Sequence, residues 1–510
     1  MAGTVSTDLV FFQGSGNQSD CESVTNWSYG AVDADNALQG TYALTYSQAS
    51  AGSKDILYTC NSTNLTGKAV FFWIRVTKPS VLSAFYIYLG DGTNYSKWNV
   101  TPSSGWTCYC IKTDQTRDSG SGTVNFGAIT KIGFGYTTTA KEVFYWDAFR
   151  NGTYIQIDGG TSSVPATLAD IWAVEDNSAN KYGILNYFQG IYFIQGILKI
   201  GSTTSGTATY FKDTSKVVVF RDARVGTSFN ELRFQGNATA STEIYLGNKS
   251  GGMGISGLFI KSEGTAKFTL TVTDTNLTKY GIYGCTLYGA QAISFQAYDV
   301  NKEVLNTTFE NCAEVVPSTA IIKYCNFISS PSSAITMSST SHNITDCAFI
   351  SCARAIHITV VGTFAYNNLD FSGNTYDGYN TSGSSVTVNY DQYCSPAPST
   401  YDPAGNLITY QTSVTLTVRH VKTGNEPTEY VRCAIYKKSD MSEIMNMDAT
   451  VADDQNAGYY KASQSYTVTG IVVIVRAREE GYLPFEIELT IGSGGLDVTA
   501  VWIPDPNYTP

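Results

Sequence analysis

Apolar and polar residues alternate along the first third of the chain in short runs, which clusters of Gly, Ser and Asn separate. A period of two residues is that of a β-strand, because successive side chains of a strand point to opposite faces of its sheet. The run at residues 69–76, for example, puts Val70, Phe72 and Ile74 on one face. About eight such runs lie within residues 1–155, and together they predict a β-sandwich.

The same alternation gives this sandwich an outward face that carries rings and charge. It is formed by four residues of two successive runs, Trp73, Arg75, Tyr86 and Tyr88. Flat rings stack on sugar rings, and hydrogen-bond donors bind sugar hydroxyl groups, so these residues predict a glycan-binding surface. The alternative is that this face packs against another chain or domain.

A repeat governs the middle of the chain, residues 165–393. Its first ladder is a large apolar residue that ends each of five aligned runs, namely Leu287, Phe309, Phe327, Phe349 and Leu369. These residues lie 22, 18, 22 and 20 positions apart, and a second ladder at Ile293, Val315, Ile335 and Ile356 follows the first. A repeat of this length made of short strands predicts a right-handed parallel β-helix of roughly eleven rungs. A helix expected at 165–174 would cover its first rung.

The last part of the chain begins after a stretch rich in proline. Residues 394–407 contain Pro396, Pro398 and Pro403 and are interpreted as a linker. Residues 408–510 return to clean alternation with turns at glycines and predict a small Ig-like β-sandwich. The expected fold class is therefore all-β, in three domains.

Composition and charge exclude several classes of protein. The 32 Lys and Arg against 43 Asp and Glu give a net charge of −11 in 510 residues, which disfavours nucleic acid as a partner. The longest apolar segment, residues 184–200, is interrupted by polar residues, and the N-terminus lacks the pattern of a signal peptide. We therefore expect neither membrane insertion nor secretion by that route. The 11 cysteines show no zinc spacing and are interpreted as buried reduced thiols.

Catalysis on a β-helix would need acids that converge on one face. Two known reactions on such folds are lyase elimination and glycoside hydrolysis by paired carboxylates. The best acid cluster is Glu310 and Glu314 on one rung with Asp346 two rungs away, and we expect these three to be solvated turn residues. We therefore expect a protein that is not an enzyme. The alternative is a polysaccharide lyase or glycoside hydrolase with a β-helix catalytic domain and an appended carbohydrate-binding module.

The residue that directly follows each member of the first ladder should point its side chain away from the interior of the β-helix. Tyr288, Ile328 and Ile350 occupy such positions, and Glu310 and Asp370 share them. Leaving large apolar side chains in water forgoes about 1.5 to 3 kcal/mol each, so we expect a cover over this stripe. The preferred cover is a neighbouring chain of a homotrimer.

Two resemblances extend this interpretation. The segments Asn26-Trp27-Ser28, Phe72-Trp73-Ile74 and Phe144-Tyr-Trp-Asp147 resemble the layout of carbohydrate-binding-module jelly rolls. Such modules often hold a structural calcium ion through an acidic residue of the last strand. The resemblance thus implies Asp147 as a calcium ligand, with Asp20 or Glu22 as possible partners; no other cofactor is expected.

The second resemblance concerns the C-terminus. The segments Gly481-Tyr-Leu-Pro-Phe-Glu486 and Asp505-Pro-Asn-Tyr508 resemble the C-terminal Ig-like domains of tailed-bacteriophage structural proteins. With the other two domains, this is similar to a virion surface protein of the tailspike, fibre or head-decoration type. The resemblance implies other virion proteins and surface glycans as partners, homotrimeric assembly, and a virion location after assembly in the host cytoplasm, where thiols stay reduced.

Overall fold

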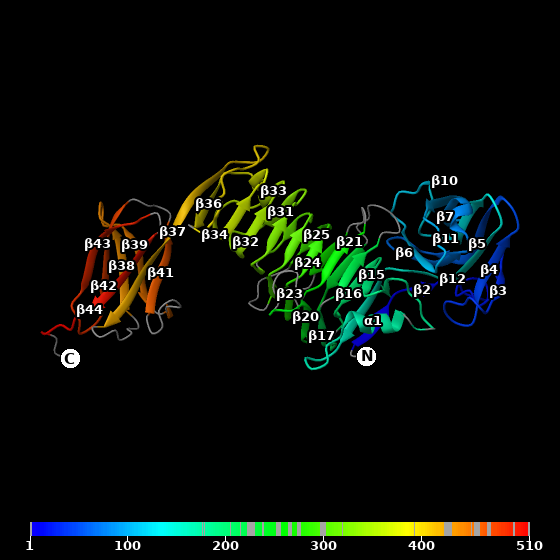
Figure 1. Cartoon of the computed structure of the whole chain (residues 1–510), viewed down its shortest axis with the longest axis horizontal. Coiled ribbons are helices and arrows are strands. Elements are labelled where there is room, and N and C mark those ends of the chain that lie inside the picture. The colour runs from blue at the N-terminus through cyan, green and yellow to red at the C-terminus, as the bar shows by residue number, and fades with distance from the viewer. Residues whose placement is uncertain are drawn as a thin grey trace. The chain divides into compact units, whose positions relative to one another are not determined.

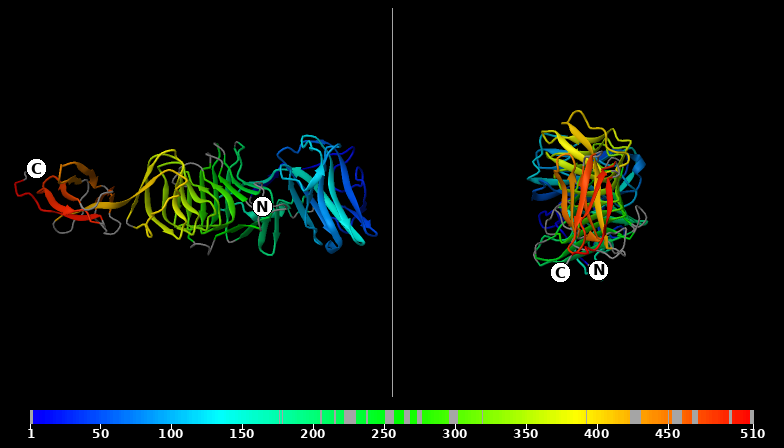
Figure 2. Two further views of the ribbon diagram at one scale, coloured as in Figure 1. Left: turned by 90° about the horizontal axis from the view of Figure 1, so that it is seen from above. Right: turned by 90° about the vertical axis from the view of Figure 1, so that its left-hand side faces the viewer.

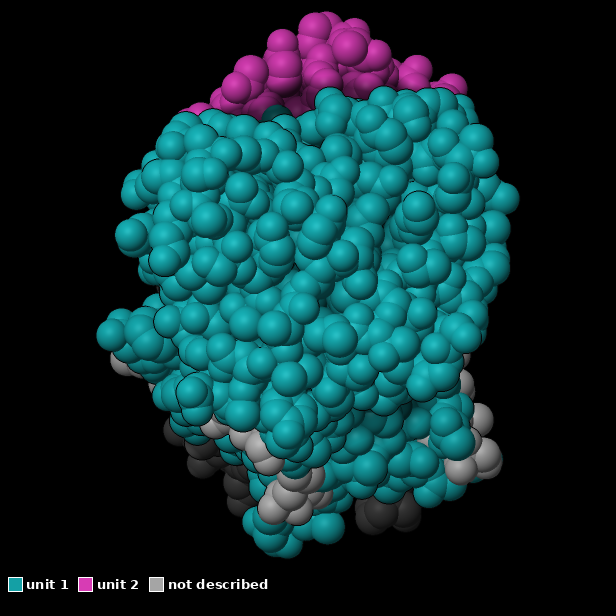
Figure 3. Space-filling view, turned by 90° about the vertical axis from the view of Figure 1, so that its right-hand side faces the viewer, with its two compact units in different colours: residues 1–336 teal, residues 337–510 magenta. Residues whose placement is uncertain are grey.

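The computed structural model describes the chain except residues 1–2, 176, 178, 205, 215, 222–229, 237–238, 251–256, 264–267, 273–276, 296–301, 319, 392, 423–430, 450, 453–459, 467–470, 493–494 and 508–510. The chain forms two compact units, residues 1–336 and residues 337–510 (Figure 3). The described part of both units is built from strands, with a single α-helix (Figure 1). The all-β fold class is confirmed.

The first unit begins with a two-sheet sandwich. One sheet has the order β3 (Ala31–Asp33), β4 (Ala43–Gln48), β12 (Glu142–Gly152), β6 (Ala69–Val76) and β9 (Thr107–Lys112), with β2 (Val10–Phe11) beside β12. We call it the six-stranded sheet. The five-stranded sheet has the order β10 (Ser119–Ser121), β8 (Tyr95–Asn99), β7 (Leu82–Gly90), β11 (Ile129–Thr138) and β5 (Gly52–Thr63).

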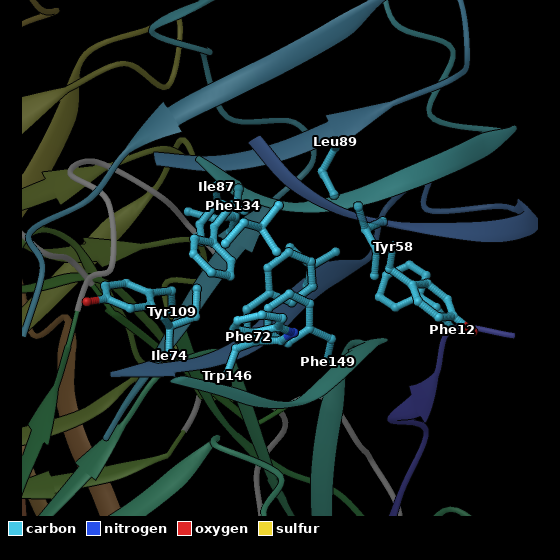
Figure 4. Close-up of a cluster of buried hydrophobic side chains, with 14 of the residues drawn as sticks. Phe12, Tyr58, Phe72, Ile74, Ile87, Leu89, Tyr109, Phe134, Trp146 and Phe149 are labelled. Carbon is cyan, nitrogen blue, oxygen red and sulfur yellow. The ribbon is translucent and has the colours of Figure 1, made fainter. Parts of the chain in front are cut away.

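The core of the sandwich lies between these two sheets. Phe72 and Ile74 enter it from β6, and Ile87 enters it from β7, as Figure 4 shows. Phe72 also stacks on Phe149 of β12, with ring centroids 4.0 Å apart. The alternation predicted for the runs at 69–76 and 84–89 is therefore confirmed, and its cause is the burial of one apolar face per strand.

The strands that follow in the first unit pair differently. They are β13 (Tyr154–Gly159), β15 (Ile191–Ile194), β16 (Ile197–Ile200), β17 (Thr209–Asp213), β18 (Val217–Phe220), β19 (Asn230–Phe234), β20 (Thr242–Gly247), β21 (Phe259–Ser262), β22 (Phe268–Val272), β23 (Lys279–Tyr283), β24 (Thr286–Tyr288), β25 (Ala290–Ser294), β26 (Lys302–Leu305), β27 (Thr308–Glu310), β28 (Val315–Val316), β29 (Ile321–Lys323), β30 (Asn326–Ile328) and β31 (Ser333–Met337). From β15 to β28, each strand pairs in parallel with the third strand after it. Figure 2 shows these strands stacked one behind the other. Such pairing is that of successive turns of a parallel coil; its handedness and its number of rungs remain predictions.

Like residues stack inside this coil. Leu287 pairs with Phe309, and Phe309 pairs with Phe327. The two phenylalanine rings are stacked, with centroids 4.8 Å apart and planes 6° apart. In the second ladder Ile293, Val315 and Ile335 are likewise in register. The repeat read from the sequence is therefore confirmed within this unit.

The first strand of the coil does not leave a bare edge. Strand β1 (Gly3–Thr7) pairs with β13 antiparallel, while β16 pairs with the other side of β13. The α-helix α1 (Leu168–Glu175) buries Leu168 and Ile171 nearby and contacts β1. The expected helix is present, but β1 supplies the hydrogen-bonding cover that a strand edge requires.

The second unit opens with its own parallel strands, β32 (Asn343–Ile350), β33 (Arg354–Ile358), β34 (Thr363–Ser372), β35 (Tyr376–Asn380), β36 (Val386–Asp391) and β37 (Ile408–Lys422). Here the predicted ladder needs a correction. Strand β34 pairs with β32 so that Phe371 lies beside Phe349, and Leu369 lies beside Cys347. The last repeat is therefore 22 residues long rather than 20.

Residues 394–407 were interpreted as a linker, yet they are anchored to the parallel strands. Tyr401 forms a parallel bridge with Gly378 of β35, and the Asp402 carboxylate accepts a hydrogen bond of 2.7 Å from Arg354 Nε. Only 6% of Asp402 is exposed. The segment packs against the strands, and its Asp402 carboxylate is paired with Arg354.

The C-terminal part of the second unit is a sandwich. One sheet contains β40 (Val451–Ala452), β41 (Tyr460–Tyr466), the second half of β37 and β44 (Leu496–Trp502). The other has the order β39 (Glu443–Ala449), β38 (Val431–Lys437), β42 (Val472–Arg478) and β43 (Phe485–Thr490). His420 is fully buried between them and stacks on Trp502, so it is a core residue. All eleven cysteines of the chain are buried, and none of them forms a disulfide.

Candidate functional site

The structure separates the four residues predicted to share one glycan-binding face. Trp73 and Arg75 lie on β6 of the six-stranded sheet. Tyr86 and Tyr88 lie on β7 of the five-stranded sheet. All four point away from the core, as the alternation requires, but they point away on opposite sides of the sandwich. The predicted single surface is therefore wrong.

Trp73 packs against another part of the chain, which was the alternative to a glycan-binding role. Its ring is 6% exposed, and its Nε1 donates a hydrogen bond of 3.1 Å to the carbonyl oxygen of Lys181, in the segment that precedes the coil. Arg75 is half-buried and donates from Nη1 to Asn36 Oδ1 at 3.0 Å. The six-stranded sheet at Trp73 thus contacts the rest of its own unit.

The outer face of the five-stranded sheet carries the other two residues within a larger group. We call this group the tyrosine surface and define it as Tyr86, Tyr88, Tyr95, Lys97 and Asp55. Strand register brings them together, since Tyr88 lies opposite Lys97 and both Tyr86 and Asp55 lie opposite Gly135. A Cβ at Gly135 would lie 2.4 Å from a ring carbon of Tyr86, so the absence of a side chain there lets the ring lie across β11.

Hydrogen bonds hold the tyrosine surface in place. The Tyr86 hydroxyl donates to Asp55 Oδ1 at 2.6 Å and accepts from Lys97 Nζ at 2.9 Å. Lys97 also forms an ion pair with Asp55 at 3.3 Å and lies 4.2 Å from the centroid of the Tyr86 ring. Tyr88 and Tyr95 stack with centroids 5.3 Å apart. The three rings are therefore fixed before any ligand arrives.

The surroundings raise the pKa of two tyrosines of this surface, Tyr86 and Tyr88. Burial, and then the hydrogen bond to Asp55, raise the pKa of Tyr86 well above its usual value. Burial also raises the pKa of Tyr88, with a further contribution from the Asp55 charge. The surface thus offers neutral rings, phenol donors and one compensated charge pair, a combination that suits an uncharged ligand with hydroxyl groups and apolar faces.

Sequence reasoning missed three members of this surface. Tyr95 and Lys97 alternate with the buried Trp98 and Ser96 on β8, and that alternation could have identified them. Asp55 could not have been found this way, because only the pairing of β5 with β11 and of β11 with β7 brings it beside Tyr86.

Asp147, the predicted calcium ligand, is fully buried on β12. Its Oδ2 accepts hydrogen bonds from the backbone nitrogens of Leu38 at 2.9 Å and Gln39 at 3.1 Å. Burial raises its pKa to about 7, and the Glu22 charge adds to that increase. Within the described part of the chain, Asp147 Oδ1 has no hydrogen-bond partner.

The surroundings of Asp147 fit a metal ion only in part. Glu22 Oε1 accepts from the backbone nitrogens of Thr41 and Tyr42, and Asp20 Oδ2 accepts from Gln18. The described residues contain no group of three or more His, Cys, Asp or Glu side chains that could hold a metal ion. A calcium ion there would have to draw ligands from carbonyl oxygens and water, and it stays a prediction.

The acids considered for catalysis have unlike surroundings. In the parallel ladder, the neighbours of Glu310 are Tyr288 and Ile328 rather than acids. Glu314 lies between β27 and β28, and its backbone oxygen accepts a hydrogen bond from the backbone nitrogen of Ile293. Asp346 belongs to the second unit, where it accepts hydrogen bonds from Thr345 Oγ1 and Asn368 Nδ2.

The predicted interface residues divide between the two units. Tyr288 is 37% exposed and Ile328 is half-buried, and Glu310 lies between them in the first unit. Ile350 lies in the second unit beside Ser372. A charged residue thus interrupts the stripe, and its role as a subunit interface remains a prediction.

No protein-family model and no curated protein matches the chain. Among solved structures, an exo-β-agarase is similar over 29% of this chain and 24% of its own length, at 11% identity and a TM-score of 0.22. A family 11 carbohydrate-binding module from Clostridium thermocellum, in complex with a β-1,3-1,4-mixed-linked tetrasaccharide, is similar over 26% of this chain and 91% of its own, at 19% identity and a TM-score of 0.21. A structure of carbohydrate-binding modules from the β-sandwich superfamily gives 15% identity over 29% of this chain and 56% of its own, with a TM-score of 0.20. The chain spans about a quarter of the agarase, and similarity at these TM-scores carries no argument about its ligand.

No helix in the described residues is long and apolar enough to cross a membrane.

Proposed function

We propose that the protein binds neutral glycans through its N-terminal sandwich and acts as a structural adhesion protein rather than as an enzyme. The tyrosine surface carries this proposal. It combines two stacked rings, a third ring beside them, and a Lys97–Asp55 ion pair. Sugars present apolar ring faces and hydroxyl groups to such surfaces.

Charge favours a neutral ligand over an acidic one. The single cation of the tyrosine surface, Lys97, is already paired with Asp55 at 3.3 Å. The chain as a whole carries a net charge of −11, so an anionic polysaccharide would meet repulsion on approach. We therefore propose uncharged oligosaccharides as the ligand class.

The proposal also includes the location at which the protein acts. We propose that the chain belongs to the surface of a tailed-phage virion, as a tailspike, fibre or head-decoration protein, among other virion proteins. The support is the combination of a sandwich, parallel strands and a second sandwich in one chain, together with the resemblance of the C-terminal segments. Electron microscopy of the source particles with antibody against this chain tests it, since unlabelled particles would contradict a virion location.

The glycan proposal is tested by binding of the full-length chain to a glycan array, followed by titration of the best ligand. Tyr88→Ala should weaken binding about tenfold, because a stacked ring contributes about 1.5 kcal/mol. We choose Tyr88 because the hydrogen bonds described for the tyrosine surface are made by Tyr86 rather than by Tyr88.

The matched control is Tyr393→Ala, which removes a tyrosine that is 61% exposed in the other unit. It should leave the affinity unchanged. Binding that survives Tyr88→Ala in full would show that the tyrosine surface is not the site.

A further inference from the structure

The first unit contains a second concave feature, between the six-stranded sheet and the beginning of the coil. It is a cleft of about 650 Å³. Trp73, Trp106 and Tyr109 line it from the sandwich, and Tyr187, Phe188 and Phe193 line it from the coil side. Its residues are distinct from those of the tyrosine surface, so the two sites can be tested apart.

The floor of the cleft is fixed by buried hydrogen bonds. Gln195 is 7% exposed, and its Nε2 donates to the carbonyl oxygens of Cys108 at 2.9 Å and Gly183 at 2.8 Å. Trp73 Nε1 donates to the carbonyl oxygen of Lys181 at 3.1 Å. These bonds join β9 and β6 to the segment that leads into the coil, so the cleft is formed before a ligand binds.

A tight hairpin builds one rim. Strand β14 (Leu185–Phe188) pairs antiparallel with β15, and Gln189 and Gly190 between them have φ angles of +49° and +86°. Positive φ at both central residues is the geometry of the two-residue turn that suits a twisted hairpin. The hairpin holds Phe188 at 64% exposure and Tyr187 at 36%. Large rings held in water at a cleft rim are typical of a binding site.

The lining of the cleft also carries a charge pair. Arg221 Nε lies 3.5 Å from Glu263 Oε2, and the guanidinium lies 3.7 Å from the centroid of the Phe193 ring. The pair adds donors and acceptors to the lining but no net charge. An apolar ligand would make no use of these donors and acceptors, and an anionic ligand would meet Glu263.

We propose that this cleft is a second glycan site, which takes a neutral oligosaccharide. Trp106 of the sandwich and Phe188 of the hairpin stack on the sugar faces, while Arg221, Glu263 and the amide of Asn186 exchange hydrogen bonds with hydroxyl groups. The cleft, unlike the tyrosine surface, encloses its ligand from two sides.

The test uses the full-length chain and a panel of neutral oligosaccharides of the gluco-, xylo-, manno- and galacto- series, with uronic-acid oligosaccharides alongside. Affinities are measured by calorimetry for the wild type, Phe188→Ala, Trp106→Ala, Tyr88→Ala and the control Tyr393→Ala. At least one neutral oligosaccharide should lose about tenfold in affinity in Phe188→Ala and in Trp106→Ala. The same ligand should keep its affinity in Tyr88→Ala and in Tyr393→Ala.

Three results would overturn the proposal: no binding of neutral oligosaccharides, full affinity in both Phe188→Ala and Trp106→Ala, or a preference for the uronic-acid series. Loss of binding in Tyr88→Ala alone would reject the cleft while leaving the tyrosine surface intact. Phe188 is mostly exposed, so its truncation should leave the fold intact, and this variant decides the matter if Trp106→Ala fails to fold.

Discussion

At the scale of the residue, Asp147 shows how burial changes the chemistry of one carboxyl group. Its pKa is raised from 3.8 to about 7, because desolvation outweighs the two backbone nitrogens that donate to it. The native state therefore holds this proton up to about pH 7, whereas the unfolded chain loses it near pH 4. Between these values the native state binds more protons, so the free energy of unfolding falls as pH rises.

We expect the chain to unfold at a lower temperature at pH 8 than at pH 5, and Asp147→Asn to reduce that difference. The upper limit of the effect between these two pH values is on the order of 3 kcal/mol, because the native and unfolded states differ in proton binding over about two pH units above pH 5. Thermal unfolding followed by circular dichroism at both pH values measures it. Asp440→Asn is the control, because Ser442 lowers the pKa of exposed Asp440 and its titration lies below this range.

Calcium changes the expected result in a defined way. An ion that binds the Asp147 carboxylate stabilises its charged form, so calcium at pH 8 should raise the unfolding temperature of the wild type but not of Asp147→Asn. Equal unfolding temperatures in calcium and in a chelator would contradict the calcium prediction. The pH difference itself would remain as a separate test of the buried carboxyl group.

The sequence predicts which way a side chain points from its strand, but not which sheet the strand joins. Alternation correctly places Trp73 and Tyr86 on the outward sides of β6 and β7. It cannot assign the two strands to sheets, because sheet membership depends on pairings between segments far apart in sequence, such as β7 with β11. The four residues predicted to share one surface therefore lie on two sheets, and glycan binding by either pair stays a prediction.

At the scale of the element, the corners of the coil set its register. Each three-residue strand of one ladder lies between two residues with positive φ, as at Gly284 and Gly289, and at Asn306 and Asn311. In the second unit Asp346 and Asn368 occupy the same kind of corner, 22 residues apart. Gly, Asn and Asp tolerate this conformation better than other residues.

These corners explain the one misaligned repeat. The apolar pattern alone allowed Leu369 to match Phe349, since both are large apolar residues. Aligning Asn368 with Asp346 would have placed Phe371 beside Phe349, as the structure does. The shift is by two residues, which preserves the inward and outward faces, so hydrophobicity could not reveal it.

One corner carries a residue poorly suited to it. Tyr324 has a φ of +56° and is 52% exposed. We expect Tyr324→Asn to stabilise the protein by about 0.5 to 1 kcal/mol, because Asn adopts this conformation at lower cost. Urea unfolding monitored by far-ultraviolet circular dichroism measures the change. Tyr42→Asn, at an exposed position where φ is not positive, should give no gain; an equal gain there would attribute the effect to polarity instead of backbone conformation.

At the scale of the whole molecule, the outward column of the first unit bears on assembly. Tyr288 and Ile328 flank Glu310 on neighbouring strands, so the column is apolar with one charge inside it. A stripe of this kind suits an interface only if a partner supplies a cation or a hydrogen-bond donor opposite Glu310. A second copy of the chain offers Lys261, which lies in the same column beside Tyr288.

We therefore predict that the purified protein is a trimer and that Ile328→Asp shifts it to monomer. An unpaired carboxylate in an apolar interface costs about 3 to 5 kcal/mol, which weakens association at least about a hundredfold. Sedimentation equilibrium measures the mass of both forms. Tyr393→Asp, a charge placed on an exposed tyrosine of the second unit, should leave the trimer intact. A trimeric Ile328→Asp variant would place the interface elsewhere on the chain, and a monomeric wild type would contradict the predicted assembly itself.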